Sequence, residues 1–138
     1  MAAAGYTLTG TLKGNLHVSP KGLLDRVITK AIYIDTTLNA LAAVAYKILH
    51  LEADTLVLGG YLITDVAEGA ADTCSVGDIA ASNTHLAATS LNTTDTVTAL
   101  TGAAKYYAAA DEIQITLSAA ITVAKFWVVI RMIQLKKS

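Results

Sequence analysis

This sequence has few of the residues that supply cross-links, rigid turns or surface charge. Its 138 residues include one cysteine, one proline, one tryptophan and one phenylalanine, and charged residues make up only 15%. The single cysteine, Cys74, excludes an internal disulfide, and no residue near it stands at metal-ligand spacing. An average globular domain is about 25% charged. So low a charge content leaves much uncharged surface, which suits a chain covered by copies of itself or by a larger assembly.

Targeting and membrane signals are also missing. Met1–Gly5 lacks the basic start and apolar core of a signal peptide, so we expect the chain to be made in the cytoplasm. The longest apolar stretches, Leu38–Leu51 and Ala119–Leu135, are too short for a membrane span or carry Lys and Arg within them. No basic cluster comes with interleaved aromatic residues. We therefore expect neither a membrane nor a nucleic-acid partner.

The net charge is only −1, but the charges are segregated along the chain. Residues 48–104 carry seven acidic and no basic side chains, whereas the segments on either side each carry a net charge of +3. Such segregation can steer one part of the molecule onto another copy or onto a charged partner. A scatter of solvated loop charges explains it equally well, and both interpretations stay open.

Strand patterns dominate what is present. Thr55–Val66 and Ala124–Leu135 are rich in residues that suit a buried pleated surface, and both are apolar on two faces. Gly59-Gly60 interrupts the first, which predicts a bulge or a close backbone approach. Glu112–Ser118 alternates and predicts Ile113, Ile115 and Leu117 inward with Gln114 and Thr116 outward. Further strands are predicted at Tyr6–Leu12, Val27–Ile34, Thr73–Val76 and Lys105–Ala109.

Two stretches are less regular. Leu38–Leu51 fits a helix by its alanines and a strand by its alternation. We favour a strand over Ala43–Leu51, joined to the next strand in a hairpin through the turn at Glu52–Asp54. Ile79–Leu100 is polar and small, which fits a long connection or several short edge pieces.

Together the strands predict an all-β fold, a β-sandwich of jelly-roll type with an extended N-terminal segment. Residues 1–26 form an N-terminal strand and arm, broken by Gly14, Pro20 and Gly22, and residues 27–138 form a single sandwich domain. A sandwich core covers only one face of each sheet. The second apolar face of the two long strands therefore predicts self-association as a dimer or trimer, unless loops or the arm fold over it.

No residue pattern supports catalysis or cofactor binding. His17, His50 and His85 are far apart and none has a partner at a metal-ligand interval. Four carboxylates lie around the central turn: Asp65, Glu68, Asp72 and Asp78. They have the oxygen ligands that calcium needs, but not the alternating spacing of a calcium-binding loop. We interpret them as solvated turn residues. We expect no catalytic, cofactor-binding or metal site, and no enzyme activity.

Several short segments resemble a group of small virion proteins of tailed phages. The resemblance covers about residues 43–135 and rests on turn and strand segments: Leu51–Gly59, Thr64–Val66, Ser75–Asp78, Leu86–Thr89, Tyr106–Ile113 and Ala124–Leu135. These proteins are head decoration, or cement, proteins with jelly-roll-like folds, usually encoded close to the major capsid protein. The sequence departs from the pattern at Ile121–Val123, where a glycine commonly precedes the last strand.

The resemblance implies a structural protein on the capsid surface of a virion, made in the host cytoplasm. It implies binding to the major capsid protein and cementing of its neighbouring subunits. The basic residues Lys13, Lys21 and Arg26 of the N-terminal segment are then candidate capsid contacts. The alternative is a tail- or fibre-associated module that binds a receptor or glycan. Its loops would display aromatic and polar residues together, whereas the loops here are rich in Ala, Thr and Ser.

Overall fold

The structure is a computed structural model and describes residues 27–135. Nine strands make up this part of the chain, and within it no helix is long and apolar enough to cross a membrane. Their bounds are β1 Val27–Asp35, β2 Ala45–Leu51, β3 Thr55–Val66, β4 Thr73–Gly77, β5 Leu86–Ser90, β6 Thr96–Ala99, β7 Lys105–Tyr107, β8 Asp111–Leu117 and β9 Lys125–Gln134. The predicted strand Tyr6–Leu12 lies outside the described residues.

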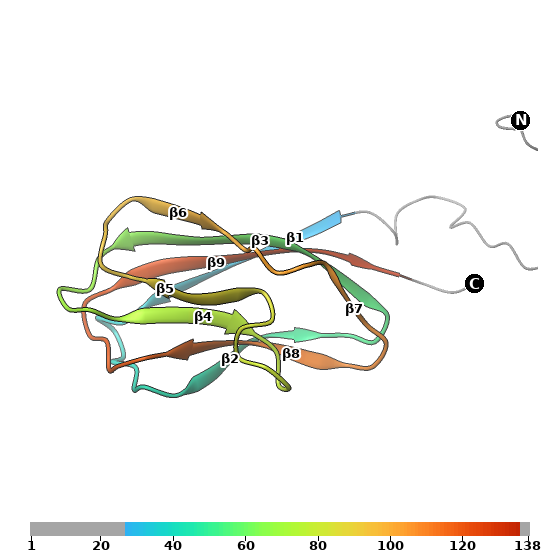
Figure 1. Cartoon of the computed structure of the whole chain (residues 1–138), viewed down its shortest axis with the longest axis horizontal. Helices are drawn as coiled ribbons and strands as arrows, with labels where there is room; N and C mark the ends of the chain where they lie inside the picture. Colours follow the sequence, from blue (N-terminus) through green and yellow to red (C-terminus); the bar gives the residue numbers. More distant parts are fainter. Residues whose placement is uncertain (1–26, 136–138) are drawn as a thin grey trace, which may run out of the picture.

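The strands form two antiparallel sheets that face each other, as Figure 1 shows. One sheet has the order β1-β9-β3-β6, with β7 also paired to β3; the other has the order β2-β8-β4-β5. If β7 is set aside and the other eight strands are lettered B to I, these orders become B-I-D-G and C-H-E-F, the arrangement of a jelly roll. The predicted all-β sandwich of jelly-roll type is confirmed for the described residues.

The expected hairpin between β2 and β3 is wrong, although the strand over Ala45–Leu51 is confirmed. β2 pairs with β8, and β3 pairs with β6, β7 and β9, so the two strands lie in different sheets. The turn at Glu52–Asp54 crosses from one layer to the other, with Asp54 at a φ of 62°. Because the chain crosses between the layers at this turn, Leu51 and Val57 enter the core from opposite sheets. A hairpin within one sheet would not allow this.

The Gly59-Gly60 bulge sets which side chains of β3 face the core. The register with β9 shifts between Val57 and Gly59. Before the shift Thr55 and Val57 are buried, and after it Leu62 and Thr64 are buried. A strand alternates with a period of two, so without the bulge one of these pairs would point outward. The backbone also approaches closely here, because a Cβ at Gly60 (φ 153°) would lie 1.7 Å from the Val129 carbonyl oxygen.

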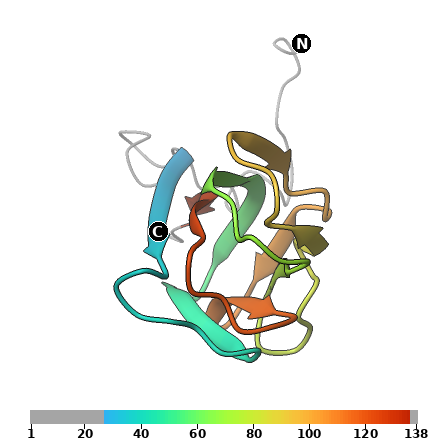
Figure 2. The same ribbon diagram turned by 90° about the vertical axis from the view of Figure 1, so that its left-hand side faces the viewer.

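The core lies between the sheets and is almost entirely aliphatic. β9 contributes Phe126, Val128, Ile130 and Met132, and β8 contributes Ile113, Ile115 and Leu117, all of them buried. The predicted inward face of β8 is therefore confirmed, and Gln114 and Thr116, which alternate with it, are partly exposed. The segment Ile79–Leu100 supplies β5 and β6, short strands at the edges of the two sheets, as one of the two interpretations expected. Viewed from the end in Figure 2, β1 lies at the outer edge of its sheet.

Candidate interaction surface

The outer face of the sheet that contains β9 is largely apolar. On β9 the residues that alternate with the buried ones point outward, and their register partners on β1 and β3 do the same. The exposed large side chains of this face come from five strands: Val27, Tyr33, Tyr61, Val97, Tyr106 and Trp127. Val97 is 64% exposed and Trp127 37% exposed. The predicted second apolar face of β3 and β9 is thus present and uncovered within the described residues.

The outer face of the opposite sheet is polar. Glu112, Gln114 and Thr116 alternate along β8, with Lys47 and His50 opposite them on β2. His50 lies between two carboxylates: its Nδ1 is hydrogen-bonded to Glu112, and its Nε2 lies 2.9 Å from Glu52. The hydrogen bond to the Glu112 carboxylate and the negative charges of Glu112 and Glu52 raise the pKa of this imidazole. The two faces of one sandwich therefore differ in character: one suits water, the other suits a protein surface.

Aromatic side chains occupy one end of the apolar face. The rings of Tyr33 and Trp127 are 4.7 Å apart at an interplanar angle of 45°. The Tyr33 hydroxyl donates a 3.4 Å hydrogen bond to Asp65. Tyr and Trp are the residues that most often carry binding energy when a partner excludes water from them. This end of the face is therefore the strongest candidate for an anchor.

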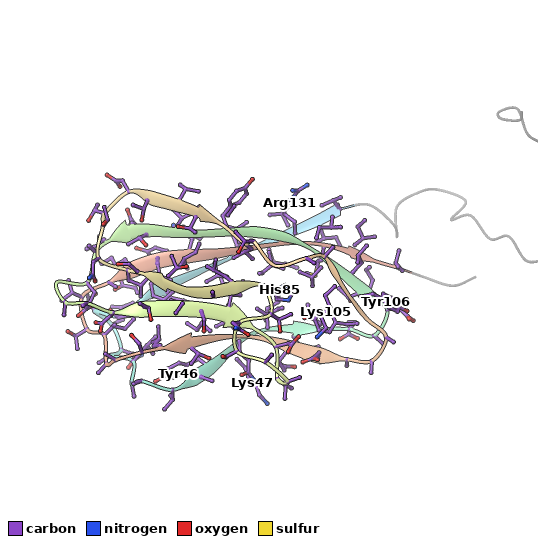
Figure 3. The ribbon with its side chains drawn as sticks, viewed as in Figure 1. Tyr46, Lys47, His85, Lys105, Tyr106 and Arg131 are labelled. Carbon is purple, nitrogen blue, oxygen red and sulfur yellow. The ribbon has the colours of Figure 1, made fainter. Side chains whose placement is uncertain are left out.

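Arg131 and Asp65 stand at opposite ends of the apolar face. Arg131 lies on β9 opposite Thr29 and Gly59, and Figure 3 places it on the far side of the molecule from Lys47. Asp65 lies near the end of β3, beside Tyr33. Within residues 27–135 no hydrogen bond or ion pair engages the Arg131 guanidinium. The face has one unpaired cation at one end and one carboxylate with only a long tyrosine contact at the other.

The interpretation of the central carboxylates as solvated turn residues is wrong for three of the four. Glu68, Asp72 and Asp78 are buried, and only Asp65 is exposed. A carboxylate leaves water only where hydrogen bonds replace its hydration. Glu68 and Asp78 have such partners, whereas Asp72 keeps one carboxylate oxygen buried and without a hydrogen-bond partner in the described part of the chain.

Glu68 holds the loop that precedes β9. Its Oε1 accepts hydrogen bonds from the backbone N–H groups of Thr122, Val123 and Ala124 at 3.2, 2.9 and 2.9 Å. Burial on its own would raise the pKa of this carboxyl, but the three N–H donors outweigh it and the pKa is lowered. The loop where the sequence lacks the expected glycine is thus shaped by a distant carboxylate.

Asp78 joins the two sheets beyond the other end of β4. Its Oδ1 accepts hydrogen bonds from the backbone N–H groups of Ala80 and Ala81. Its Oδ2 accepts hydrogen bonds from Lys105 Nζ at 2.7 Å and from the Tyr107 hydroxyl at 2.8 Å. Burial opposes ionisation of Asp78, but the bonds from Lys105 and Tyr107 hold its pKa at about 2.

His85 completes this buried cluster. Its Nε2 lies 2.8 Å from the Tyr107 oxygen, whose proton is already donated to Asp78, so Nε2 carries the proton of this pair. Burial lowers the pKa of His85, which favours the neutral ring. Figure 3 shows His85 and Lys105 at the same end of the molecule as Tyr106. Asp78, Tyr107 and His85 are buried and hydrogen-bonded to one another. The cluster therefore links the two sheets and has a structural role.

Only some of the residues proposed from the sequence as site residues lie in the described part of the structure. Lys13, Lys21 and Arg26, the expected capsid contacts, and His17 lie outside the described residues. Within residues 27–135 no group of three His, Cys, Asp or Glu side chains is placed to hold a metal ion. Cys74 is a free, buried thiol whose pKa burial raises to about 12. Sequence reasoning assigned neither Arg131 nor Asp65 to this face. The alternation of inward and outward residues along β9 and β3 was the signal that could have placed both there.

Comparison with solved structures gives the same fold in three phage capsids. Against a chain of the capsid of Ralstonia phage GP4 the TM-score is 0.64 at 14% identity, covering 91% of this chain and 95% of that one. Against the capsid asymmetric unit of cyanophage Pam1 it is 0.63 at 18% identity, covering 90% and 96%. Against the acidic stable capsid of Helicobacter pylori bacteriophage KHP30 it is 0.61 at 11% identity, covering 77% and 86%.

These similarities show a shared fold over most of each chain. No family model matches the sequence, and no curated protein matches it. The three related chains are close to this one in length, because most of both partners is covered in each comparison.

Proposed function

We propose that this chain is a structural protein of a phage virion that binds the outside of the capsid shell and cements neighbouring major capsid protein subunits. One observation carries the proposal: three phage capsids contain a chain of similar length whose fold matches 77–91% of this chain. The role needs no catalysis and no cofactor. It requires a stable small fold with a surface to bury, and the sandwich supplies both.

The charge distribution supports attachment through one end of the molecule. Val27 at the start of β1 pairs with Ile133 near the end of β9, so the chain enters and leaves the described fold at one end. Lys13, Lys21 and Arg26 precede this point in sequence, and two further lysines follow it. Opposite charge on the shell would then steer the protein into register and make attachment weaken as salt rises.

Attachment over a shell is multiplied by repetition. A stable interface buries about 1,600 Å² in total. A protein that touches two neighbouring subunits at once is held more tightly than either contact alone, because the second contact forms at high effective concentration. Binding of this kind staples the subunits together without any covalent step.

The test uses particles produced from the genome that carries this gene. Mass spectrometry of purified particles should find the chain, and gold-labelled antibodies against it should decorate heads. Particles stripped of the chain should rebind the purified protein. A Lys21→Glu/Arg26→Glu variant should detach at lower salt than the unmodified protein, whereas Lys47→Glu, on the polar outer face of β2, should not. Absence of the chain from particles, or label confined to tails, would refute the capsid role and favour the receptor-binding alternative.

A further inference from the structure

We propose that the apolar outer face of the β1-β9-β3-β6 sheet is the interface of a two-fold symmetric dimer of this chain. The occupant of the face is a second copy, oriented so that Arg131 of each protomer meets Asp65 of the other. The proposal is independent of the virion role, since it concerns only what two copies do in solution.

The area of the face suits a modest dimer. β1, β9 and β3 are 9, 10 and 12 residues long, and the short strands β6 and β7 both pair with β3. Four rows of backbone about 4.8 Å apart, at about 3.3 Å per residue, give a footprint of roughly 600 Å². Two such faces bury roughly 1,200 Å², at the lower end of stable interfaces. Tyr33, Tyr61 and Trp127 are half-exposed aromatics of the kind that dominate binding energy. We therefore expect dissociation in the micromolar range.

The charges on the face define the orientation. Arg131 is level with Gly59 of β3, and Asp65 lies six residues further along that strand. The two are thus roughly 20 Å apart along the strands. The midpoint between them lies between Tyr61 and Ile63 on the outer face of β3, whose register partners on β9 are Val129 and Trp127.

Consider a two-fold axis that passes through this midpoint, lies in the plane between the two faces and runs perpendicular to the strands. Rotation about it reverses the strand direction of one copy relative to the other. It therefore brings the Arg131 end of one copy over the Asp65 end of the other, twice in each dimer. The strands of the two copies stay nearly parallel to one another's axes, as in aligned sheet packing. The other two charges at the Asp65 end, Lys125 and Asp35, lie 3.9 Å apart on the same protomer and neutralise each other.

A second occupant would have to match this same pattern. A partner with an apolar surface alone would leave Arg131 without a counter-charge, at a cost that grows as water is excluded. A second copy supplies the needed carboxylate by symmetry. These two symmetry-related ion pairs distinguish a specific dimer from non-specific association through the apolar face.

Sedimentation velocity of the full chain across the micromolar range tests the proposal. The unmodified protein should show a concentration-dependent monomer–dimer equilibrium. Arg131→Glu and Asp65→Arg should each raise the dissociation constant roughly tenfold or more, because each places two like-charged pairs in the interface. The double variant R131E/D65R restores opposite charges and should recover most of the affinity. Lys47→Glu, on the opposite polar face, is the matched control and should leave the equilibrium unchanged.

Circular dichroism melting of each variant checks that the monomers remain folded. A protein that stays monomeric throughout this range would overturn the proposal, whatever else covers the face. So would single variants that dimerise as well as the unmodified protein. Loss of dimer in the single variants without recovery in the folded double variant would also overturn it, because the Arg131–Asp65 reciprocity would then be wrong.

Discussion

Replacing Glu68 tests whether one buried carboxylate holds the loop before β9. Its Oε1 accepts backbone hydrogen bonds from residues 122, 123 and 124, and the Ala124 N–H is buried. Removing the side chain in Glu68→Ala leaves these donors unpaired. A hydrogen bond to a charged group contributes about 1.5–3 kcal/mol, and a buried donor left unpaired costs about 1–3 kcal/mol.

The three bonds share one oxygen and the loop can relax toward water, so their contributions are not additive. We expect Glu68→Ala to lower the free energy of unfolding by about 3 kcal/mol. For a chain of this size that is roughly 10 °C in melting temperature. Glu68→Gln keeps the shape but loses the charge and should cost about half as much. Glu52→Gln is the control, because the Glu52 side chain is 73% exposed and should change stability by less than about 0.5 kcal/mol.

The pH dependence gives an independent signature. The pKa of Glu68 is lower in the folded state than its usual 4.5, so the folded protein holds fewer protons there than the unfolded chain as pH falls through that region. The stability that the charge contributes is full above pH 4.5 and is lost below it as the folded pKa is crossed. The difference between the unmodified protein and Glu68→Gln should therefore shrink on acidification. Urea unfolding at several pH values measures this difference in the free energy of unfolding. A difference that stays constant from neutral to strongly acidic pH would refute the reasoning. So would a Glu68→Ala variant as stable as the unmodified protein.

Three further predictions concern the core, the bulge and the buried histidine. Ile115→Ala should lower the free energy of unfolding by about 2–5 kcal/mol and Gln114→Ala by almost nothing; equal effects in urea titrations would mean that the β8 register is wrong. Gly60→Ala should abolish folding or lower the free energy of unfolding by at least about 3 kcal/mol, since its Cβ would overlap a carbonyl oxygen of β9. Gly69→Ala is the control, because a Cβ there meets open space and should leave stability unchanged. Circular dichroism melting compares the two variants. Burial lowers the pKa of His85, so stability should fall as pH drops below about 6.5, and His85→Gln should flatten that part of the pH profile.

Much of the strand content was readable in the sequence because it depends on local pattern. The bounds of β3 coincide with those expected, and the ends of β1, β4, β8 and β9 differ from expectation by about one residue. The period-two alternation of β8 placed Ile115 inward and Gln114 outward, since one face of its sheet meets water. The two-faced apolar character of β3 and β9 likewise predicted an outer surface that remains uncovered within the described residues.

Strand pairing was not readable from local pattern. β2 and β3 look like the two arms of a hairpin, because they are adjacent strands joined by a short turn. Among the strands of residues 27–135, only one consecutive pair, β4 and β5, is hydrogen-bonded. Which strands pair depends on how two whole layers cover one core, and that is a property of all nine strands together.

The sequence by itself determined an all-β chain with surplus apolar surface and no pattern for chemistry. Only the tertiary structure decided which polar residues belong to the interior. Glu68 and Asp78 look like solvent-facing turn residues until the fold brings backbone N–H groups, Lys105 and Tyr107 to them from 27 to 56 residues away. The physical reason is that burial of a charge depends on partners, and these partners are set by long-range packing, not by neighbours in the chain.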